Sequence, residues 1–313
     1  MRKNIKIWTM VEKDLTGTRK QCLALAHQLK GTVKEKNITL RWPWSWLSPY
    51  FSFGIQYAVK PKLKAPWPDM LIAAGRQSIA PALWIKKQSR NKTYIHFVQD
   101  PKWNHNKFDS LSAPQHDNLT GDNVFQTFGA LNDINKTTLA HAKKAFPKFA
   151  KNEKPRIAVL IGGNSKTHKM NNSIIEQIKS IKGSLMITAS RRTPQKYINA
   201  LKTLKGTFWN GRGKNPFKAY LAYADYILVT SDSVSMISEA VATGKPVYLL
   251  KMNGTSPKFE RFYNAFIKAG HVKWFSGELE NWGTKPLNET AKLAQWLKAR
   301  YQNHVTKLKN KTD

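Results

Sequence analysis

The chain has 313 residues, of which 41% are hydrophobic, enough for about two globular domains with real cores. Its 52 Lys and Arg residues against 19 Asp and Glu residues give a formal net charge of +33. Such a surface favours anionic partners such as nucleic acid, anionic lipid or phosphorylated substrates. The single cysteine, Cys22, excludes an internal disulfide framework and a cysteine-rich zinc site.

The N-terminal half alternates short apolar runs with turns that contain glycine or polar residues. We expect strands over residues 5–10, 38–40, 70–74, 94–98 and 108–113. The first strand leads through a turn with Gly17 into a helix, which is a common form of ligand loop and also of plain turn. The third strand ends at Gly75 and Arg76, and Arg76 could bind an anionic group or form a surface salt bridge.

The last two of these strands should deliver acidic and imidazole side chains to one edge of the sheet. Asp100 follows the strand over residues 94–98, and His116 and Asp117 follow the next. A carboxylate beside an imidazole at such an edge could act as a general base. Such a pair is also commonly a hydrogen-bonded loop anchor. No His or acidic cluster has the spacing of a metal site, so we expect none.

Between the second and third strands lies an aromatic segment, residues 41–64. Its rings are Trp42, Trp44, Trp46, Tyr50, Phe51, Phe53 and Tyr57, and its edges carry Arg41, Lys60, Lys62 and Lys64. Prolines prevent one long helix. Rings interleaved with cations suit the interface of an anionic membrane, and they also suit stacking on single-stranded nucleic acid or packing into the core.

The C-terminal half restarts the same alternation. We expect domains over 1–150 and 151–313, a linker near 139–154, and a last helix over 289–301 that crosses back onto the first domain. Strands are expected over residues 156–161, 185–189, 207–210, 226–230 and 246–250, with helices over 172–182 and 259–269. The fold class is therefore α/β, with two Rossmann-like domains built on parallel sheets.

The strand ends of this half carry the groups that an anionic ligand needs. Gly162 and Gly163 lack side chains, so the backbone there can come close to a ligand. Arg191 and Arg192, adjacent at a helix N-terminus, form an anion site. The helix after residues 226–230 starts among small polar residues that can cap it, and its N-terminus suits phosphate. Glu239 on that helix could accept hydrogen bonds from a sugar hydroxyl of the same ligand. The alternative is a well-capped crossover helix without a ligand.

Several motifs resemble those of the Elm1-like proteins of bacteria and plants. They are GGNSK, ITASRRTP, the run Asn215–Phe217, VTSDSVSMISEAVATGKPVYLL, PDMLIAAGRQS, PQHD, and Gly17 with Gln21. The plant members are called mitochondrial fission factors, and bacterial members have been labelled sugar-nucleotide epimerases. One departure is Lys20, where the family often has Asn. The family is similar in turn to glycosyltransferases of the GT-B type, which have two Rossmann-like domains with a cleft between them.

This resemblance implies roles for residues of both halves. Ser233, Val234 and Ser235 would bind the donor diphosphate, Glu239 the ribose, and Asn210 with Gly211 would lie near the base. The diphosphate and sugar would be bordered by Gly162, Gly163 and Asn164, and its charge would be balanced by Arg191 and Arg192. On the acceptor side the implied residues are Gly17, Gln21, Gly75 and Arg76, with Asp100, His116 or Asp117 as catalytic groups.

We therefore expect a metal-independent glycosyltransferase that takes a nucleotide-diphosphate sugar as co-substrate and a lipid-linked or envelope-glycan acceptor. Its membrane contacts would come from Trp42, Trp44, Trp46, Tyr50, Phe51 and Phe53. The N-terminus lacks the apolar core of a signal peptide, so we expect a cytoplasmic protein, peripheral on the inner face of the membrane. The alternatives are a non-catalytic membrane scaffold of the Elm1 type and a nucleotide-sugar epimerase. Nucleic-acid binding is the weakest reading, because no recognition motif accompanies the charge.

Overall fold

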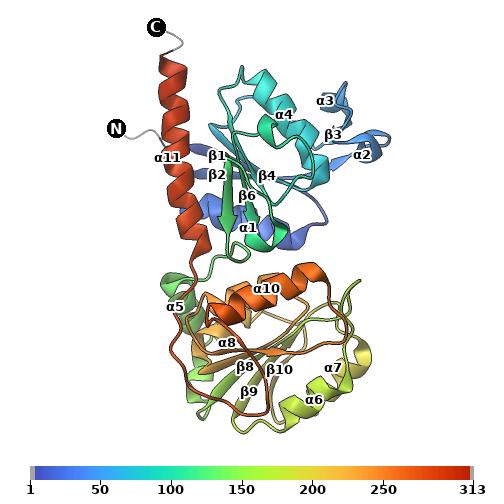
Figure 1. Ribbon diagram of the computed structural model, residues 1–313, viewed down its shortest axis with the longest axis vertical. Coiled ribbons are helices and arrows are strands. Elements are labelled where there is room, and N and C mark those ends of the chain that lie inside the picture. Colours follow the sequence, from blue (N-terminus) through green and yellow to red (C-terminus); the bar gives the residue numbers. More distant parts are fainter. Residues whose placement is uncertain (1–3, 311–313) are drawn as a thin grey trace. The chain divides into compact units, whose positions relative to one another are not determined.

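Short apolar runs form the inner strands of two sheets in the computed structural model, which describes residues 4–310 (Figure 1). The chain divides into two α/β units. Within the described residues, the first comprises 4–133 and 289–310, and the second comprises 134–288. Residues 134–150 thus pack with the second unit, whereas the sequence suggested a boundary at residue 150, and the C-terminal helix packs with the first unit.

The first unit is built on a seven-stranded sheet in the order β3-β2-β1-β4-β5-β6-β7. All neighbours are parallel except β3, which pairs antiparallel with β2. The strands are β1 (Lys6–Glu12), β2 (Thr32–Leu40), β3 (Val59–Lys60), β4 (Met70–Ala74), β5 (Tyr94–Val98), β6 (Ser110–Pro114) and β7 (Val124–Thr127). Every residue of β4 and β5 is buried, as expected for central strands covered on both faces.

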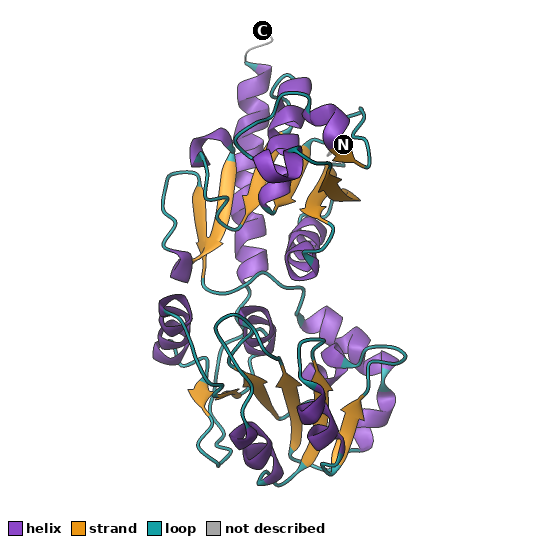
Figure 2. Ribbon diagram, turned by 90° about the vertical axis from the view of Figure 1, so that its right-hand side faces the viewer, coloured by secondary structure: helices purple, strands orange, loops and turns teal. Residues whose placement is uncertain are grey.

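Helices cover both faces of this sheet. The helices are α1 (Thr16–Gln28), α2 (Trp44–Leu47), α3 (Ile55–Ala58), α4 (Ile79–Gln88) and α11 (Glu289–Lys309), with short 3-10 turns η1 (Arg76–Ser78), η2 (His105–Lys107) and η3 (Gln115–Asp117). One core joins α1 and α11 to one face of the sheet, and another joins α3 and α4 to the opposite face (Figures 1 and 2). Glu289 and Thr290 tie the start of α11 to the backbone of Phe128 and Asn132, which fixes the returning chain on this unit.

The second unit has a six-stranded parallel sheet in the order β10-β9-β8-β11-β12-β13. The strands are β8 (Arg156–Ile161), β9 (Ser184–Ala189), β10 (Gly206–Trp209), β11 (Tyr226–Thr230), β12 (Val247–Leu250) and β13 (Lys273–Trp274). The chain order reverses between β8 and β11. The carboxyl ends of these two strands therefore form a topological switch point, where open α/β sheets bind ligands.

Two groups of helices cover the faces of the second sheet. The helices are α5 (Lys136–Ala145), α6 (Asn172–Lys179), α7 (Gln195–Lys202), α8 (Phe217–Tyr223), α9 (Val234–Val241) and α10 (Pro257–Lys268), with a 3-10 turn η4 (Pro147–Lys151). Helices α6 and α7 lie on one side of the sheet and α8 and α10 on the other (Figure 1). Gly244 ends α9 with a φ of +72°, the left-handed conformation that favours glycine at this position. Among the helices described between residues 4 and 310, none is long and apolar enough to cross a bilayer.

A histidine buried in the first sheet should make the first unit sensitive to acid. His96 on β5 is fully buried, and its ring nitrogens lie 2.9 and 3.0 Å from the hydroxyls of Ser110 and Ser112 on β6. Burial lowers the pKa of His96 from 6.5 to about 3. Between pH 6.5 and about 3, His96 is therefore protonated in the unfolded chain but neutral in the folded chain. The free energy of unfolding thus falls as the pH drops from 6.5 towards 3.

We expect the first unit to lose about 1.4 kcal/mol of unfolding free energy per pH unit in this window through His96, or roughly 2 kcal/mol by pH 5. Amide hydrogen exchange of β5 and β6, measured between pH 7 and 5, reports the loss. His96→Gln should flatten the slope, and His27→Gln, at an exposed position on α1, should keep it. Equal slopes in the wild type and His96→Gln would contradict the assignment.

Candidate functional site

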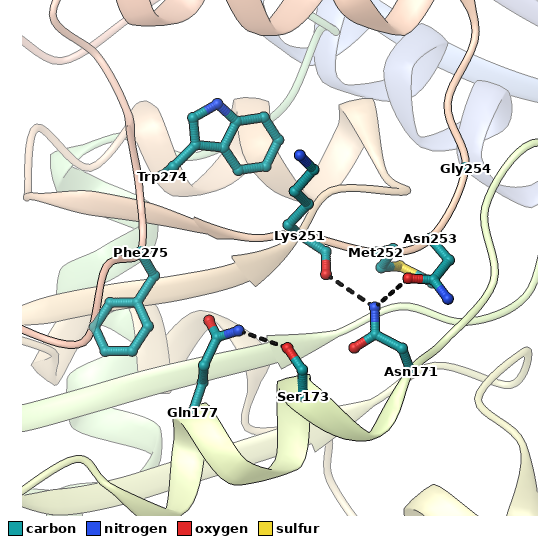
Figure 3. Close-up of a pocket in the computed structure, with 9 residues that line it drawn as sticks. All are labelled: Asn171, Ser173, Gln177, Lys251, Met252, Asn253, Gly254, Trp274 and Phe275. Carbon is teal, nitrogen blue, oxygen red and sulfur yellow. Dashed lines mark hydrogen bonds between the residues drawn. The ribbon is translucent and has the colours of Figure 1, made fainter.

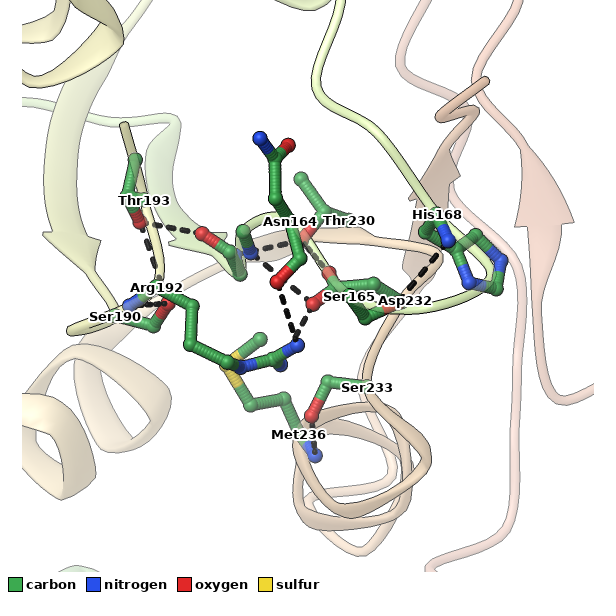
Figure 4. Close-up of polar contacts among 12 residues, drawn as sticks. Asn164, Ser165, His168, Ser190, Arg192, Thr193, Thr230, Asp232, Ser233 and Met236 are labelled. Carbon is green, nitrogen blue, oxygen red and sulfur yellow. Dashed lines mark hydrogen bonds and ion pairs between the residues drawn. The ribbon is translucent and has the colours of Figure 1, made fainter. Parts of the chain in front are cut away.

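The loops that follow β8, β9 and β11 meet at the carboxyl edge of the second sheet (Figure 4). Asp232, just past β11, is the centre of their contacts. Its side chain is completely buried, and it accepts hydrogen bonds from the Gly163 amide (3.1 Å), the Thr230 hydroxyl (2.7 Å) and the Arg192 guanidinium (2.8 Å). The sequence had suggested for Asp232 only a helix cap, whereas the structure makes it the link between three loops.

The glycine pair after β8 is required by this packing. The Gly162 amide donates to the Thr230 hydroxyl at 2.7 Å, and the Asn164 amide donates to the Arg192 carbonyl at 3.2 Å. A Cβ atom on Gly162 would overlap the Asp232 carboxylate, and one on Gly163 would overlap the Arg192 backbone. The amides of residues 162–164 thus all bond within the chain. The Asn164 side chain is exposed, and its oxygen accepts a hydrogen bond from the Met170 amide at 2.9 Å, which leaves its NH₂ group to meet a ligand.

The two adjacent arginines have different surroundings. The Arg192 guanidinium pairs with Asp232, contacts the Asn164 carbonyl at 3.4 Å, and lies above the first turn of α9 (Figure 4). Arg191 is exposed and has no hydrogen-bond or ion-pair partner among residues 4–310. Of the predicted pair, only Arg191 therefore has its full charge available to an anion.

The first turn of α9 has open backbone donors. Ser233 caps the helix by accepting a hydrogen bond from the Met236 amide at 3.3 Å. The amides of Val234 and Ser235 have no partner among the described residues, and both residues are partly exposed. Glu239 lies further along the helix and is half-buried. These donors and the cationic loop after β9 make the start of α9 the part of this edge that suits an anion.

The residues predicted to lie near a nucleobase form an exposed loop at the edge strand. Asn210 follows β10, and its side chain accepts a hydrogen bond from the Arg212 amide at 3.0 Å. Gly211 has a φ of +86° and open space beside it. Strands β9 and β8 separate β10 from β11, and the hydrogen bonds of this loop among residues 4–310 stay within the loop. A contact of Asn210 and Gly211 with a base remains a prediction.

A buried histidine network that the sequence did not indicate supports the same edge. His168 Nε2 lies 2.8 Å from the Tyr263 hydroxyl, which donates to the Ser231 carbonyl at 2.6 Å. The tyrosine proton is committed to that carbonyl, so His168 must donate from Nε2 and accept from Thr167 at Nδ1, 2.9 Å away. Burial lowers the pKa of His168, in keeping with this neutral form. The network ties the loop after β8 to α10.

In the first unit, Asp100 and the pair His116 and Asp117 lie in neighbouring loops. Asp100 accepts from Lys102 Nζ at 2.6 Å and from His105 Nε2 at 2.9 Å. Burial alone would raise the pKa of Asp100, but hydrogen bonds from Lys102 and His105 outweigh burial and hold that pKa below its ordinary value. His116 is buried, with Nε2 3.9 Å from Asp117 Oδ1. Lys102 also interacts electrostatically with Asp117, so the structure brings the two loops together.

The predicted acceptor residues are spread over two elements. Gly17 is exposed in the first turn of α1, and Gln21 is buried on the same helix. Gly75 has a φ of +89°, and a Cβ there would lie 2.8 Å from the Glu12 carboxylate. Arg76 donates to backbone carbonyls of the aromatic segment, as described next, so its guanidinium already has partners.

Arg76 fixes the aromatic segment to the end of β4. Its guanidinium donates to the carbonyls of Ser45 (2.7 Å), Trp46 (3.2 Å) and Ser48 (2.5 Å), and the Ser48 hydroxyl donates back to the Arg76 carbonyl at 3.2 Å. Trp44 packs against the core, and its indole donates to the Phe53 carbonyl at 2.7 Å. Trp44 is therefore an internal anchor and not part of the outward-facing set in which the sequence placed it.

The other rings of the segment face solvent. Between 44% and 82% of the surface of each is exposed in Trp42, Trp46, Tyr50, Phe51, Phe53 and Tyr57. Arg41, Lys60, Lys62 and Lys64 are exposed beside them. Packing of all these rings into the core, one of the alternatives from the sequence, is thus wrong.

Among the described residues 4–310, no group of three or more His, Cys, Asp or Glu side chains is placed to hold a metal ion.

Comparison with known proteins identifies the family. The model of the family described as Mitochondrial fission ELM1 matches residues 16–301. The chain belongs to this family. The mitochondrial fission protein ELM1 of Arabidopsis thaliana is 31% identical, over 77% of this chain and 66% of the plant protein, so the chain spans just under two thirds of that relative. An uncharacterized protein of Rickettsia prowazekii (strain Madrid E) is 30% identical, over 94% of this chain and 98% of that protein.

Solved structures share the fold of this ELM1 family member. The glycotransferase of kitacinnamycin has a TM-score of 0.52 at 11% identity, covering 96% of this chain and 94% of that chain. The UDP-GlcNAc 2-epimerase of Neisseria meningitidis, solved with UDP-GlcNAc, has a TM-score of 0.50 at 15% identity, covering 96% and 93%. The predicted fold class, two Rossmann-like α/β units of the GT-B type, is confirmed.

Proposed function

We propose that the second unit binds a nucleotide-diphosphate sugar and that the protein transfers the sugar as a glycosyltransferase. The observation that carries this proposal is the open anion site at the start of α9. The Val234 and Ser235 amides have no partner among residues 4–310, and Arg191 is exposed and unpaired in the loop after β9, next to Arg192. Amide donors, a helix dipole and a guanidinium together suit a diphosphate.

The same groups would assist the chemistry. In sugar transfer, negative charge develops on the leaving diphosphate as the bond to the sugar breaks. Fixed donors aimed at that charge stabilise the transition state, and the Arg192–Asp232 pair would keep the loop after β8 in place beside them. Glu239, five residues into α9, is the candidate acceptor for the ribose hydroxyls.

The candidate base belongs to the first unit. Asp100 is a poor choice, because its contacts with Lys102 and His105 hold its pKa below the ordinary value. We therefore assign deprotonation of the acceptor hydroxyl to the His116–Asp117 pair rather than to Asp100. Gly17 and Gln21 remain candidates for acceptor contacts.

The aromatic segment would hold the protein on an anionic membrane surface, where a lipid-linked or envelope-glycan acceptor is found. Exposed indole and phenyl rings partition to the headgroup region, and Lys60, Lys62 and Lys64 would meet the lipid charge. Arg76 holds the segment in shape before it binds. This proposal implies a protein of the cytoplasm, peripheral on the inner face of the membrane.

A second candidate function is a membrane scaffold without catalysis. It is favoured by the hydrogen bonds that the amides of residues 162–164 donate within the chain, because these leave the loop after β8 with few donors for a ligand. In that case the aromatic segment would carry the function and the start of α9 would be only a helix end.

Nucleotide binding separates the two candidates. We expect UDP, UDP-sugars or other nucleotide-sugars to raise the thermal unfolding temperature, since a ligand at 100 times its dissociation constant adds about 2.7 kcal/mol. Arg191→Ala should weaken binding by roughly ten- to a hundredfold, because a charge-assisted hydrogen bond contributes about 1.5–3 kcal/mol. Lys202→Ala, which removes the same charge from an exposed position on α7, should leave binding unchanged. If no nucleotide binds, the enzyme proposal fails and the scaffold remains.

A further inference from the structure

The second unit contains a pocket that none of the residues assigned above lines. It has a volume of about 750 Å³ and lies between the start of α6, the loop after β12 and the end of β13 (Figure 3). Its walls include Asn171, Gln177, Lys251 and Trp274. Helix α6 packs in the core on one face of the sheet, together with Phe275 of this pocket wall. The start of α9 does not line the pocket.

The polar walls of this pocket are fixed by bonds within the chain. The Asn171 amide donates to the Lys251 carbonyl (3.2 Å) and to the Asn253 side chain (2.9 Å), and its oxygen caps α6 at Ile174. Lys169 and Asn253 form a backbone bridge with bonds of 2.8 and 3.0 Å. The two loops are therefore held together without a ligand, which lowers the cost of ordering them on binding.

Three groups in the pocket have unused binding capacity. The Lys251 ammonium is exposed and has no ion-pair or side-chain hydrogen-bond partner among residues 4–310. Trp274 is 36% exposed and packs edge-on against Tyr263, with the ring centroids 5.2 Å apart, and it lines the same pocket as Lys251 (Figure 3). The Gln177 amide donates to Ser173 at 2.9 Å, which leaves its carbonyl oxygen as an acceptor. Of the described residues that line the pocket, none carries a carboxylate.

These groups define the chemistry of a ligand. An indole offers an apolar face to the C–H groups of a sugar ring, and side-chain amides and hydroxyls match sugar hydroxyls. A lone ammonium with no carboxylate nearby selects a ligand with an anionic substituent. A nucleotide di- or triphosphate fits less well, because α6 has its first turn capped by Asn171 and no arginine lines the pocket. We propose that this pocket is a second ligand site, for an acidic saccharide such as a uronate or a sugar phosphate.

The test uses the indole N–H resonance of Trp274 in the full-length protein, identified by its loss in Trp274→Ala. Glucuronate and glucose 6-phosphate should shift this resonance at roughly tenfold lower concentration than glucose, the preference expected for one charge-assisted contact. Lys251→Gln should abolish that preference and leave the weak glucose response. Lys182→Gln, an exposed lysine elsewhere on the unit, should retain it. The two acids compared with each other show whether a carboxylate or a phosphate is selected.

Other results would overturn the site. No shift with either acid, equal responses to the acids and glucose, or an acid preference that survives Lys251→Gln would each do so. A shift with UMP but not with the sugars would reassign the pocket to a nucleotide. The proposal does not rest on sugar transfer, since Arg191→Ala should leave the Trp274 response intact even where it removes nucleotide binding.

Discussion

Gly162→Ala should destabilise the second unit by about 3 kcal/mol, although it adds a single methyl group. The new Cβ would overlap the Asp232 carboxylate, which is buried and bonded to the Gly163 amide, Thr230 and Arg192. Moving that carboxylate breaks its ion pair and leaves buried donors unsatisfied, at about 1–3 kcal/mol each. Arg192 is partly exposed, so water can hydrate its guanidinium once the ion pair is broken. We therefore place the loss of unfolding free energy near the lower end of the range for broken buried ion pairs.

A matched glycine provides the control. Gly283 lies in the same unit, has no atom within 4 Å of a Cβ position and does not have a positive φ. Gly283→Ala should change the unfolding free energy by less than about 0.5 kcal/mol. Urea unfolding followed by hydrogen exchange of β8 and β11 measures both variants, and equal stability of the two would refute the proposed packing.

The double variant Gly162→Ala with Asp232→Ala sharpens the test. Removing the carboxylate removes the collision, so the two changes should be less than additive, with a coupling of about 1–2 kcal/mol. Strict additivity would mean that the methyl group and the carboxylate do not meet. The nucleotide-dependent rise in unfolding temperature should fall in Gly162→Ala as well, because the loop beside α9 moves.

Two buried strands in each unit could be predicted to the residue. Met70–Ala74, Tyr94–Val98, Arg156–Ile161 and Tyr226–Thr230 are continuous apolar runs bounded by polar turns, and each is the strand that the structure contains. Their carboxyl ends were correctly expected to bear the polar loops. The edge strand β10 was predicted within one residue of its observed range. The edge strands β7 and β13 were not found, because they are short and half-polar or exposed, so burial imposes no pattern on their sequences.

The role of Gly162 and Gly163 could not be predicted from the sequence, for a different reason. A glycine shows that some atom comes close to the backbone, but not whether that atom belongs to a ligand or to the chain. At Gly162 the neighbour is Asp232, from a strand end far along the sequence. The same limit applied to Arg76, whose partners are carbonyls of the aromatic segment. Long-range polar partners have no local signal, whereas the apolar runs do.

Replacing three exposed rings of the aromatic segment should abolish most membrane binding. In the variant Trp42→Ser, Trp46→Ser, Phe53→Ser, each change removes a ring that is at least 75% exposed, so the fold loses little. If each ring gains about 1 kcal/mol on entering the headgroup region, the variant should bind vesicles roughly 100-fold more weakly. Co-sedimentation with vesicles of phosphatidylcholine, with and without phosphatidylglycerol, measures this.

The charges of the segment should act differently from its rings. Lys60→Gln, Lys62→Gln, Lys64→Gln should weaken binding only to the vesicles that contain phosphatidylglycerol, by about 1 kcal/mol per lysine at low salt. The ring variant should lose binding to both kinds of vesicle. Trp274→Ala, which removes a partly exposed ring from the other unit, serves as the control and should bind as the wild type does.

The anchoring by Arg76 makes a further distinction possible. Arg76→Ala removes donors to three carbonyls but none of the exposed rings, so it should loosen the segment and weaken vesicle binding by less than the ring variant. Faster proteolysis within residues 41–64 would report the loosening directly. Because Arg76→Ala keeps the exposed rings but loosens the segment, its effect on vesicle binding measures the contribution of preorganisation separately from that of hydrophobic contact. If the wild type binds single-stranded oligonucleotides and no vesicle, the rings stack on bases and the membrane proposal is withdrawn.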